Sequence, residues 1–428
     1  MTLTAARQVA DAVLYEGYLL YPYRASSSKN VIRWQFGVLG PVGAAEAGVG
    51  EAPNQSSELV LQPRPGATVT ALLRFLQVQS RTVEARDGDC WVPVDELQVG
   101  TTRWIPFHEA VAREIPMPEL PVDRPQRLDV GVPGGRDIED LYDGDVLVGR
   151  LIRTRWALAG RVTVTRRPGT DPRLVVLGLH VENSTSWAAG TVPGWTDRDV
   201  AARYSFVGTH LLVTADRADF VSLLDGPDWA DADTRACRQT RCWPVLIADD
   251  TGKDAVLIAP IILGDHPTIA PESAGDLFDA TEIDEILTLR IMTMTESERA
   301  EARGTDPRAA AILARCDAMT DEELDRLHGA RRDEDVDPEK DAVMVGGVPV
   351  AKGTRVLLRP SRRADAQDLF LAGLTAVVAR VYTDLDGATH VAVMLEDDPG
   401  TDLYAATGRF YYFGPEELEP LPERAPSR

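Results

Sequence analysis

Cysteine is scarce in this chain of 428 residues, which contains four. These four, at positions 90, 237, 242 and 316, are too few and too scattered for a disulfide framework. Unpaired thiols are typical of a reducing compartment, so we expect a cytoplasmic protein. No apolar run approaches the roughly 20 residues of a transmembrane helix. The first residues also lack the charged and apolar regions of a signal peptide. We therefore expect neither membrane insertion nor a signal peptide.

Basic side chains are outnumbered as well. Lys and Arg together number 45 against 67 Asp and Glu, which gives a formal net charge of −22. This excess of negative charge would repel phosphates unless basic residues gathered in one place, and Arg359–Arg363 is too short for that. We expect no nucleic-acid partner. At 44% hydrophobic and 26% charged residues, the chain has the composition of an ordinary globular protein.

Catalytic motifs are also missing from the sequence. It contains no G-x-S-x-G, no phosphate-binding G-x-x-x-x-G-K-[ST] and no dinucleotide-binding G-x-G-x-x-G placed after a strand. The six histidines are scattered and form no H-E-x-x-H pair, although His180 and His210 fall in expected strands and could meet across a sheet. We therefore assign no catalytic residues and expect no cofactor.

What the chain does have is one concentrated aromatic segment, residues 14–37. Four tyrosines fall within nine residues of this segment, although only 6% of the whole chain is aromatic. Tyr and Trp combine a large apolar body with a polar tip, which suits them to rigid contacts. Two interpretations stay open: packing inside the protein, or contact with a partner. The partner-contact candidates are Tyr15, Tyr18, Tyr21, Tyr23, Arg24, Trp34 and Phe36.

Residues 1–280 read as one β-rich domain behind a short helix at 4–13. Stretches rich in β-branched residues predict strands at 67–83, 145–164, 173–181, 204–214, 242–248 and 255–262. Residues 124–140 are expected to form a loop. Strands separated by Gly, Pro and Asp, without helices between them, favour an antiparallel β-sandwich over a βαβ fold.

The pattern changes at residue 281. Helix-capping motifs occur at Thr281, Thr295, Asp306 and Thr320, so residues 281–341 are expected to form a short helical array followed by a charged linker. Residues 342–428 return to short strands. Asp386-Gly387 lies between alternating apolar residues, the usual signal for a hairpin turn. We expect a small SH3-like β-barrel there.

Two groups of residues could carry chemistry. His266, Glu272, Asp276 and Asp279 could bind a divalent metal or exchange protons, but the same stretch also fits a structured connector that caps the next helix. Cys237 and Cys242 could be half of a metal site. No second cysteine pair accompanies them, so ordinary thiols are the alternative.

Four longer stretches resemble a known family. They are LYEGYLLYPYRASSSKNVIRWQFGVL (14–39), FVSLLDGPDWA (220–230), the stretch 259–293 from APIILGDHP to LRIMT, and the stretch 368–421 from DLFLAGLTAVV to PEELEPL. Together they resemble the accessory proteins encoded beside nickel–iron hydrogenases, including the high-affinity actinobacterial type. The resemblance implies a role in assembly or maturation of the hydrogenase, and it brings no catalytic residues with it.

Three hypotheses follow. The first is a non-enzymatic accessory protein that binds a nickel–iron hydrogenase subunit or a maturation protein. The second is a metal-binding protein or metal-dependent enzyme that uses the region around His266. The third is a ligand-binding sandwich, for instance for carbohydrate, with tryptophans and tyrosines as stacking surfaces. The tryptophans that could serve are Trp34, Trp91, Trp104, Trp187 and Trp195.

Overall fold

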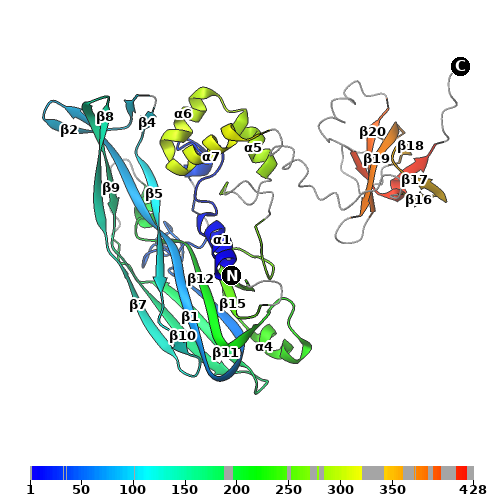
Figure 1. Cartoon of the computed structure of the whole chain (residues 1–428), viewed down its shortest axis with the longest axis horizontal. Helices are drawn as coiled ribbons and strands as arrows, with labels where there is room; N and C mark the ends of the chain where they lie inside the picture. The colour runs from blue at the N-terminus through cyan, green and yellow to red at the C-terminus, as the bar shows by residue number, and fades with distance from the viewer. Residues whose placement is uncertain are drawn as a thin grey trace. The chain divides into compact units, whose positions relative to one another are not determined.

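The structure is a computed structural model of the whole chain (Figure 1). It describes residues 2–31, 33–34, 36–100, 102–187, 196–247, 252–269, 277–278, 284–320, 342–359, 371, 373–383, 389–396 and 411–421. The chain forms two compact units, Met1–His328 and Gly329–Arg428.

The first unit is built around one very long strand, β1 (Asn54–Asp87). This strand is the centre of a 13-stranded sheet whose main path runs β14-β15-β12-β1-β11-β10-β7. The partners are antiparallel. Their bounds are β7 (Gln126–Val132), β10 (Leu158–Pro168), β11 (Val175–Asn183), β12 (Phe206–Val221), β14 (Trp243–Leu246) and β15 (Ala255–Ala259).

Different stretches of β1 pair with different neighbours. Its first part pairs with β11, its middle with β12, and its last part with β5 and β9. Register shifts after Pro63 and after Arg74 bend the strand, as β-bulges do. The remaining strands of this unit are β2 (Cys90–Val94), β3 (Leu97–Val99), β4 (Thr102–Trp104), β5 (Phe107–Pro116), β6 (Leu120–Pro121), β8 (Gly135–Asp143), β9 (Val146–Arg155) and β13 (Gln239–Thr240).

The main core lies between the inward faces of these strands. Leu59, Leu61, Leu73 and Phe75 alternate along β1 and are buried there, as the two-residue period of a strand requires. Phe75 stacks on Phe206 of β12, with ring centroids 4.2 Å apart. The outer face of β12 is covered by α1 (Thr2–Tyr15), which lies along the sheet in Figure 1.

Three helices form a cluster, namely α5 (Asp284–Met292), α6 (Glu296–Thr305) and α7 (Pro307–Ala318), and α6 lies beside β4 (Figure 1). The capping predictions for α6 and α7 are confirmed. Thr295 and Glu298 form a capping box, and the Asp306 side chain accepts a hydrogen bond from the Arg308 amide next to Pro307. Shorter helices are α2 (Ser28–Val31), α3 (Asp197–Ala202), η1 (Asp228–Ala230) and α4 (Asp231–Ala236).

The second unit contains a five-stranded antiparallel sheet with the order β21-β20-β19-β18-β22. It has its own core, which includes Val356, Val378, Val391 and Phe413. The bounds are β16 (Val343–Val345), β17 (Val348–Val350), β18 (Arg355–Leu358), β19 (Thr375–Thr383), β20 (Thr389–Leu395), β21 (Tyr411–Phe413), η3 (Pro415–Glu417) and β22 (Leu418–Pro420). β19 and β20 pair as the expected hairpin requires, while Asp386-Gly387 lies outside the described residues.

The prediction of a mainly β, antiparallel protein with a few helices is confirmed. The narrower predictions, a sandwich, an SH3-like barrel and three domains with boundaries at 280 and 341, stay predictions. The charged linker and the helix expected after Thr320 lie outside the described residues, as does the cap at Thr281.

Three local predictions are wrong. The expected loop at 124–140 forms β7 and much of β8. The expected strand at 145–164 is divided at Trp156-Ala157 into β9 and β10, and α3 and α4 stand between strands. β8 looked like a loop because its residues are mostly polar and exposed. It is a strand at the edge of the sheet, where its carboxylates meet arginines of β9.

Candidate functional site

The aromatic segment runs from the end of α1 into the interior of the first unit. The side chains of Tyr18 and Tyr23 are fully buried, and that of Trp34 is 9% exposed. These three residues are packed inside the folded protein. The other partner-contact candidates are only partly buried, and they are Tyr15, Tyr21, Arg24 and Phe36.

This segment joins the helices to the sheet. Tyr18 and Tyr23 share a core with Leu287 and Ile291 of α5 and with Leu313 of α7. The Tyr23 hydroxyl donates to the Leu277 carbonyl at 2.9 Å. The Tyr18 hydroxyl donates to Asp306 Oδ2 at 2.8 Å and accepts from the Ala110 amide at 3.2 Å. Both polar tips are therefore used inside the protein. Burial raises the pKa of Tyr18 well above its usual value, and the Asp306 carboxylate raises it further.

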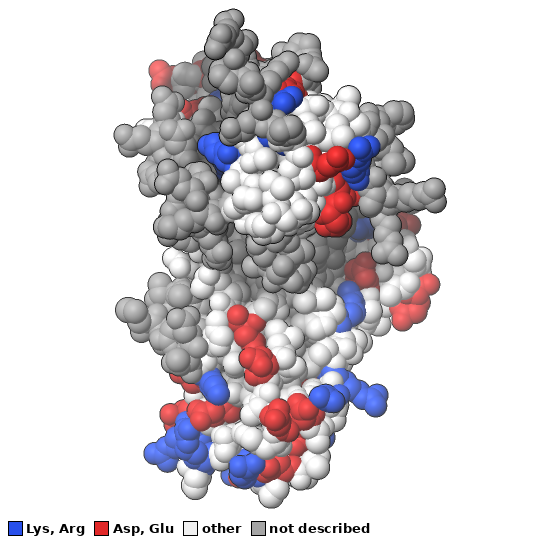
Figure 2. Space-filling model, turned by 90° about the vertical axis from the view of Figure 1, so that its right-hand side faces the viewer, with Lys and Arg blue, Asp and Glu red and all other residues white. Residues whose placement is uncertain are grey.

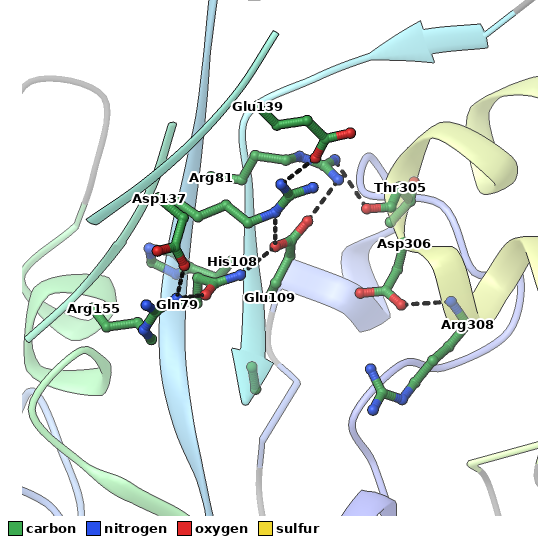
Figure 3. A network of polar contacts seen from close by, with 12 residues as sticks. Gln79, Arg81, His108, Glu109, Asp137, Glu139, Arg155, Thr305, Asp306 and Arg308 are labelled. Carbon is green, nitrogen blue, oxygen red and sulfur yellow. Dashed lines mark hydrogen bonds and ion pairs between the residues drawn. The ribbon is translucent and has the colours of Figure 1, made fainter. Parts of the chain in front are cut away.

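A network of charged side chains lies beside this segment (Figure 3). Its centre is Arg81 of β1, which is fully buried. Its Nη1 donates to Glu109 Oε1 of β5 at 2.9 Å and its Nε to the Ile105 carbonyl at 3.0 Å. Its Nη2 donates to the carbonyls of Gly304 and Thr305 at 2.9 and 3.0 Å. A cation at the last carbonyls of α6 suits the negative end of that helix.

The second oxygen of Glu109 is also occupied. Glu109 Oε2 accepts from Gln79 Nε2 at 2.7 Å and from Arg153 Nε at 2.8 Å. Arg153 continues to Glu139 on β8, and Arg155 bonds both Gln79 and Asp137. Figure 3 shows Arg81 and Glu109 pointing toward one another, with the helix end that carries Thr305 and Asp306 beside them. A buried carboxylate whose two oxygens are held by three donors is a structural anchor, because it is fixed on both sides.

His108 precedes Glu109 on β5, so its side chain lies on the opposite face of that strand. Its ring stacks on Trp34 with centroids 6.0 Å apart, and its Nε2 accepts from Arg203 Nε at 3.2 Å. Burial lowers the pKa of His108 well below its usual value, and the nearby Arg203 and Arg33 lower it further. The imidazole is therefore a neutral acceptor near neutral pH.

Of the four expected metal ligands, His266 alone lies in the described part of the chain. His266 donates its backbone N–H to the Leu246 carbonyl at 2.7 Å, and Asp265 accepts from Ser222 and from the Leu246 amide. Glu272, Asp276 and Asp279 lie outside the described residues. Within the described ranges, no group of three His, Cys, Asp or Glu side chains could hold a metal ion. The metal hypothesis at 266–279 stays a prediction.

The two central cysteines are in surroundings that favour the thiol. Cys237 Sγ contacts the Asp233 carbonyl at 3.3 Å, and Cys242 Sγ contacts the Ser56 carbonyl at 3.4 Å. Burial raises the pKa of Cys237 to about 11 and that of Cys242 to about 12. Both side chains are therefore thiols near neutral pH, and the proposed half-site at Cys237 and Cys242 stays a prediction.

His180 and His210, which could have met across a sheet, do not lie together. His180 lies opposite Ser56 of β1, whereas His210 lies opposite Arg74, well along the same strand. Burial lowers the pKa of His210 to about 3. Among the other tryptophans, Trp91, Trp104 and Trp187 are half-buried, and Trp195 lies outside the described residues. Arg150 covers the Trp91 ring at 4.3 Å, which leaves less of that face for a ligand.

Sequence reasoning missed the Arg81–Glu109 pair. The signal was present, because Arg74 and Arg81 are the only charged residues between positions 67 and 83 of β1, and a charge inside a buried strand needs a partner. The sequence could not identify the partners of Arg81, because they lie far from it along the chain. One of them is the carbonyl of Thr305.

On the face shown in Figure 2, acidic and basic side chains are intermixed and do not separate by sign. No described helix is long and apolar enough to cross a membrane.

No protein-family profile matches the chain, and no curated protein matches it.

Proposed function

We propose that this protein is a non-enzymatic accessory protein that binds a nickel–iron hydrogenase subunit or a maturation protein during hydrogenase assembly. The four sequence stretches that resemble such proteins support this partner, and the acidic composition suits a cytoplasmic chain. The structural observation that supports it is the outer face of α5. An accessory protein of this kind needs a rigid contact surface and no reactive group of its own.

The outer face of α5 is apolar and exposed. Ile286 is 38% exposed, Leu289 37% and Met292 46%. These residues are three apart, so they lie on one side of the helix. The inner residues Leu287 and Ile291 are fully buried against the aromatic segment. A helix that is apolar on both faces, with only one of them covered, is typical of an interaction site.

The aromatic segment supports that surface from behind. Tyr21 is half-buried, and the Arg290 guanidinium lies 5.9 Å from the centre of its ring. Tyr23 fixes the segment through its bond to the Leu277 carbonyl. The segment therefore contributes mainly by positioning α5. Tyr21 and Arg290 would form the edge of the contact.

We also propose the finer architecture on which this role would rest. The large sheet would serve as a sandwich-like platform, and the second unit, with its five antiparallel strands, would be a small SH3-like barrel. Barrels of this size commonly serve as binding modules. The second unit would supply a further contact.

The test is direct capture of a defined partner. The tagged protein is co-expressed with the precursor of a hydrogenase large subunit, and the complex is recovered by affinity purification. The double variant Leu289→Glu/Met292→Glu keeps good helix formers but places charges on the apolar face. We expect it to retain at most about a tenth of the captured precursor, because central apolar contacts dominate interface energies.

Ile138→Glu is the matched control, since Ile138 is equally apolar and 53% exposed on β8. It should capture the precursor like the wild type. Unchanged capture by the α5 variant would show that α5 is not the contact surface. The function itself would be wrong if a strain lacking the protein kept normal hydrogenase activity and nickel content.

A further inference from the structure

A pocket of about 180 Å³ opens where the aromatic segment meets α3. Arg33 and Trp34 form one wall, and Ala202 and Ser205 lie in or just after α3. Val49 comes from the loop before β1, and Arg198 is exposed near the beginning of α3. The pocket is not part of the Arg81–Glu109 network and has no role in the proposed contact through α5.

Arg33 is the unusual group in this pocket. Its guanidinium donates to two backbone carbonyls, Tyr18 O at 3.2 Å and His108 O. It also lies 3.9 Å from the centre of the Phe107 ring and 4.4 Å from that of Trp34. None of the described carboxylates forms an ion pair with it. Burial lowers the pKa of Arg33 to about 10, which still leaves it charged at neutral pH.

A buried cation without an anionic partner is costly in a folded protein. The two carboxylates whose fields reach Arg33 are Asp306 and Glu109. Asp306 is held by Tyr18 and the Arg308 amide, and Glu109 by Arg81, Gln79 and Arg153. A guanidinium has five N–H donors, and among the described residues Arg33 donates to two backbone carbonyls, those of Tyr18 and His108. Arg33 lines the pocket, so an anion bound against it there would offset this buried charge.

The rest of the lining narrows the choice of anion. Val38, Val49 and Val207 make part of the wall apolar. The buried indole Nε1 of Trp34 has no hydrogen-bond partner in the described part of the structure. Glu51 also lines the pocket, where it faces Arg241 at 3.4 Å. A negative side chain in the wall disfavours a doubly charged phosphate more than a singly charged group.

We propose that this pocket binds a small monocarboxylic acid, with its carboxylate on Arg33 and its apolar body against the valines and Trp34. The volume fits a molecule of about ten non-hydrogen atoms, at the roughly 20 Å³ that each such atom fills in a close-packed interior. The planar fork of the guanidinium matches a carboxylate. Arg198 adds positive charge at the exposed side.

The test uses benzoate as the probe and benzamide as its neutral counterpart of the same shape. Isothermal titration calorimetry on the full chain measures both, and tryptophan fluorescence reports on Trp34. We expect benzoate to bind in the range of about 10 µM to 1 mM and benzamide at least about tenfold more weakly. Added salt should weaken benzoate binding, because the contact is an ion pair.

Two variants locate the site. Ala202→Leu fills the pocket without removing a charge, and Arg33→Gln removes the cation. Each should weaken benzoate binding by at least about tenfold, whereas Arg235→Gln, an exposed arginine on α4, should leave it unchanged. If Arg33→Gln does not fold, as judged by circular dichroism, Ala202→Leu decides. The proposal fails if benzoate does not bind at roughly 10 mM, if benzamide binds equally well, or if Ala202→Leu binds like the wild type.

Discussion

At the scale of single residues, the most informative feature is a buried glutamate that accepts hydrogen bonds through both of its oxygens. Glu109 accepts from Arg81, Gln79 and Arg153, and it lies in a buried site next to the end of α6. Buried charges are stable only when they are paired and hydrogen-bonded. The same cluster in a looser or wetter setting would look like an acid–base site. Here the geometry favours a bridge between sheet and helices.

Comparing two carboxylates that share Arg153 tests this interpretation. Glu109→Gln should lower the free energy of unfolding by about 3–5 kcal/mol, because it leaves the buried Arg81 without a compensating charge. Glu139→Gln removes the exposed partner of Arg153 and should cost less than about 1 kcal/mol. The side chains of Glu109 and Glu139 are 8% and 51% exposed. Urea unfolding measures both, and equal losses would contradict the bridging role.

For buried charged residues, the sequence predicts that a partner is needed but not which residue it is. Arg33, Arg74 and Arg81 stand out as charges within apolar or aromatic surroundings, so a sequence predicts that they need partners. It does not predict which partners, because Arg81 bonds Thr305 and Tyr18 bonds Asp306 across most of the first unit. The aromatic segment was visible at once, but only burial showed that Tyr18 and Tyr23 face inward.

At the scale of elements, the sequence signals that act over a few residues gave correct predictions. The caps at Thr295 and Asp306 predicted where α6 and α7 begin, since a cap acts within four residues. β7 and β8 were missed because their pairing is not local. Residues 126–132 become a strand by pairing with β10, and the polar residues of β8 by pairing with β9. β8 carries little apolar pattern of its own, as edge strands often do. In β7, by contrast, Leu128, Val130 and Val132 alternate as in a half-buried strand, a signal that was present in the sequence.

Gly304 in α6 offers a test of the contact between helix and sheet. Replacing Gly by Ala within a helix usually stabilises it by about 1 kcal/mol. At Gly304, however, an added Cβ would lie 1.9 Å from the Arg103 carbonyl oxygen on β4. Gly304→Ala should therefore lower the free energy of unfolding by about 1–3 kcal/mol, because the helix must move away from the sheet and from Arg81.

Gly131 on β7 is the matched control for that substitution. A Cβ added there meets nothing within 4 Å and requires no left-handed backbone. Gly131→Ala should change the free energy of unfolding by less than about 0.5 kcal/mol. Chemical denaturation of both variants measures the two changes in the free energy of unfolding. Stabilisation by Gly304→Ala would mean that α6 does not approach β4 this closely.

At the scale of the whole molecule, the chain consists of two units with separate cores. The helices α5–α7 share their core with the aromatic segment, so they belong to the unit of the large sheet. Composition and strand patterns were enough to predict a mainly β protein and a separate group of strands near the C-terminus. They could not show that the helices would pack on the sheet, because that contact depends on Tyr18, Tyr23 and Arg81 acting together.

Separate cores predict separate unfolding. A fragment of residues 329–428 should fold alone, because the Val356, Val378, Val391 and Phe413 core is formed entirely within it. The fragment of residues 1–328 should fold as well. Calorimetry of the full chain should then show two transitions, each within about 3 °C of the midpoint of one fragment, since units that share no core unfold independently. A single transition for the full chain, together with an unfolded 329–428 fragment by circular dichroism, would mean that the small sheet depends on the large unit. The C-terminal strands would then be an extension of the first unit and could not act as an independent binding module in the proposed assembly role.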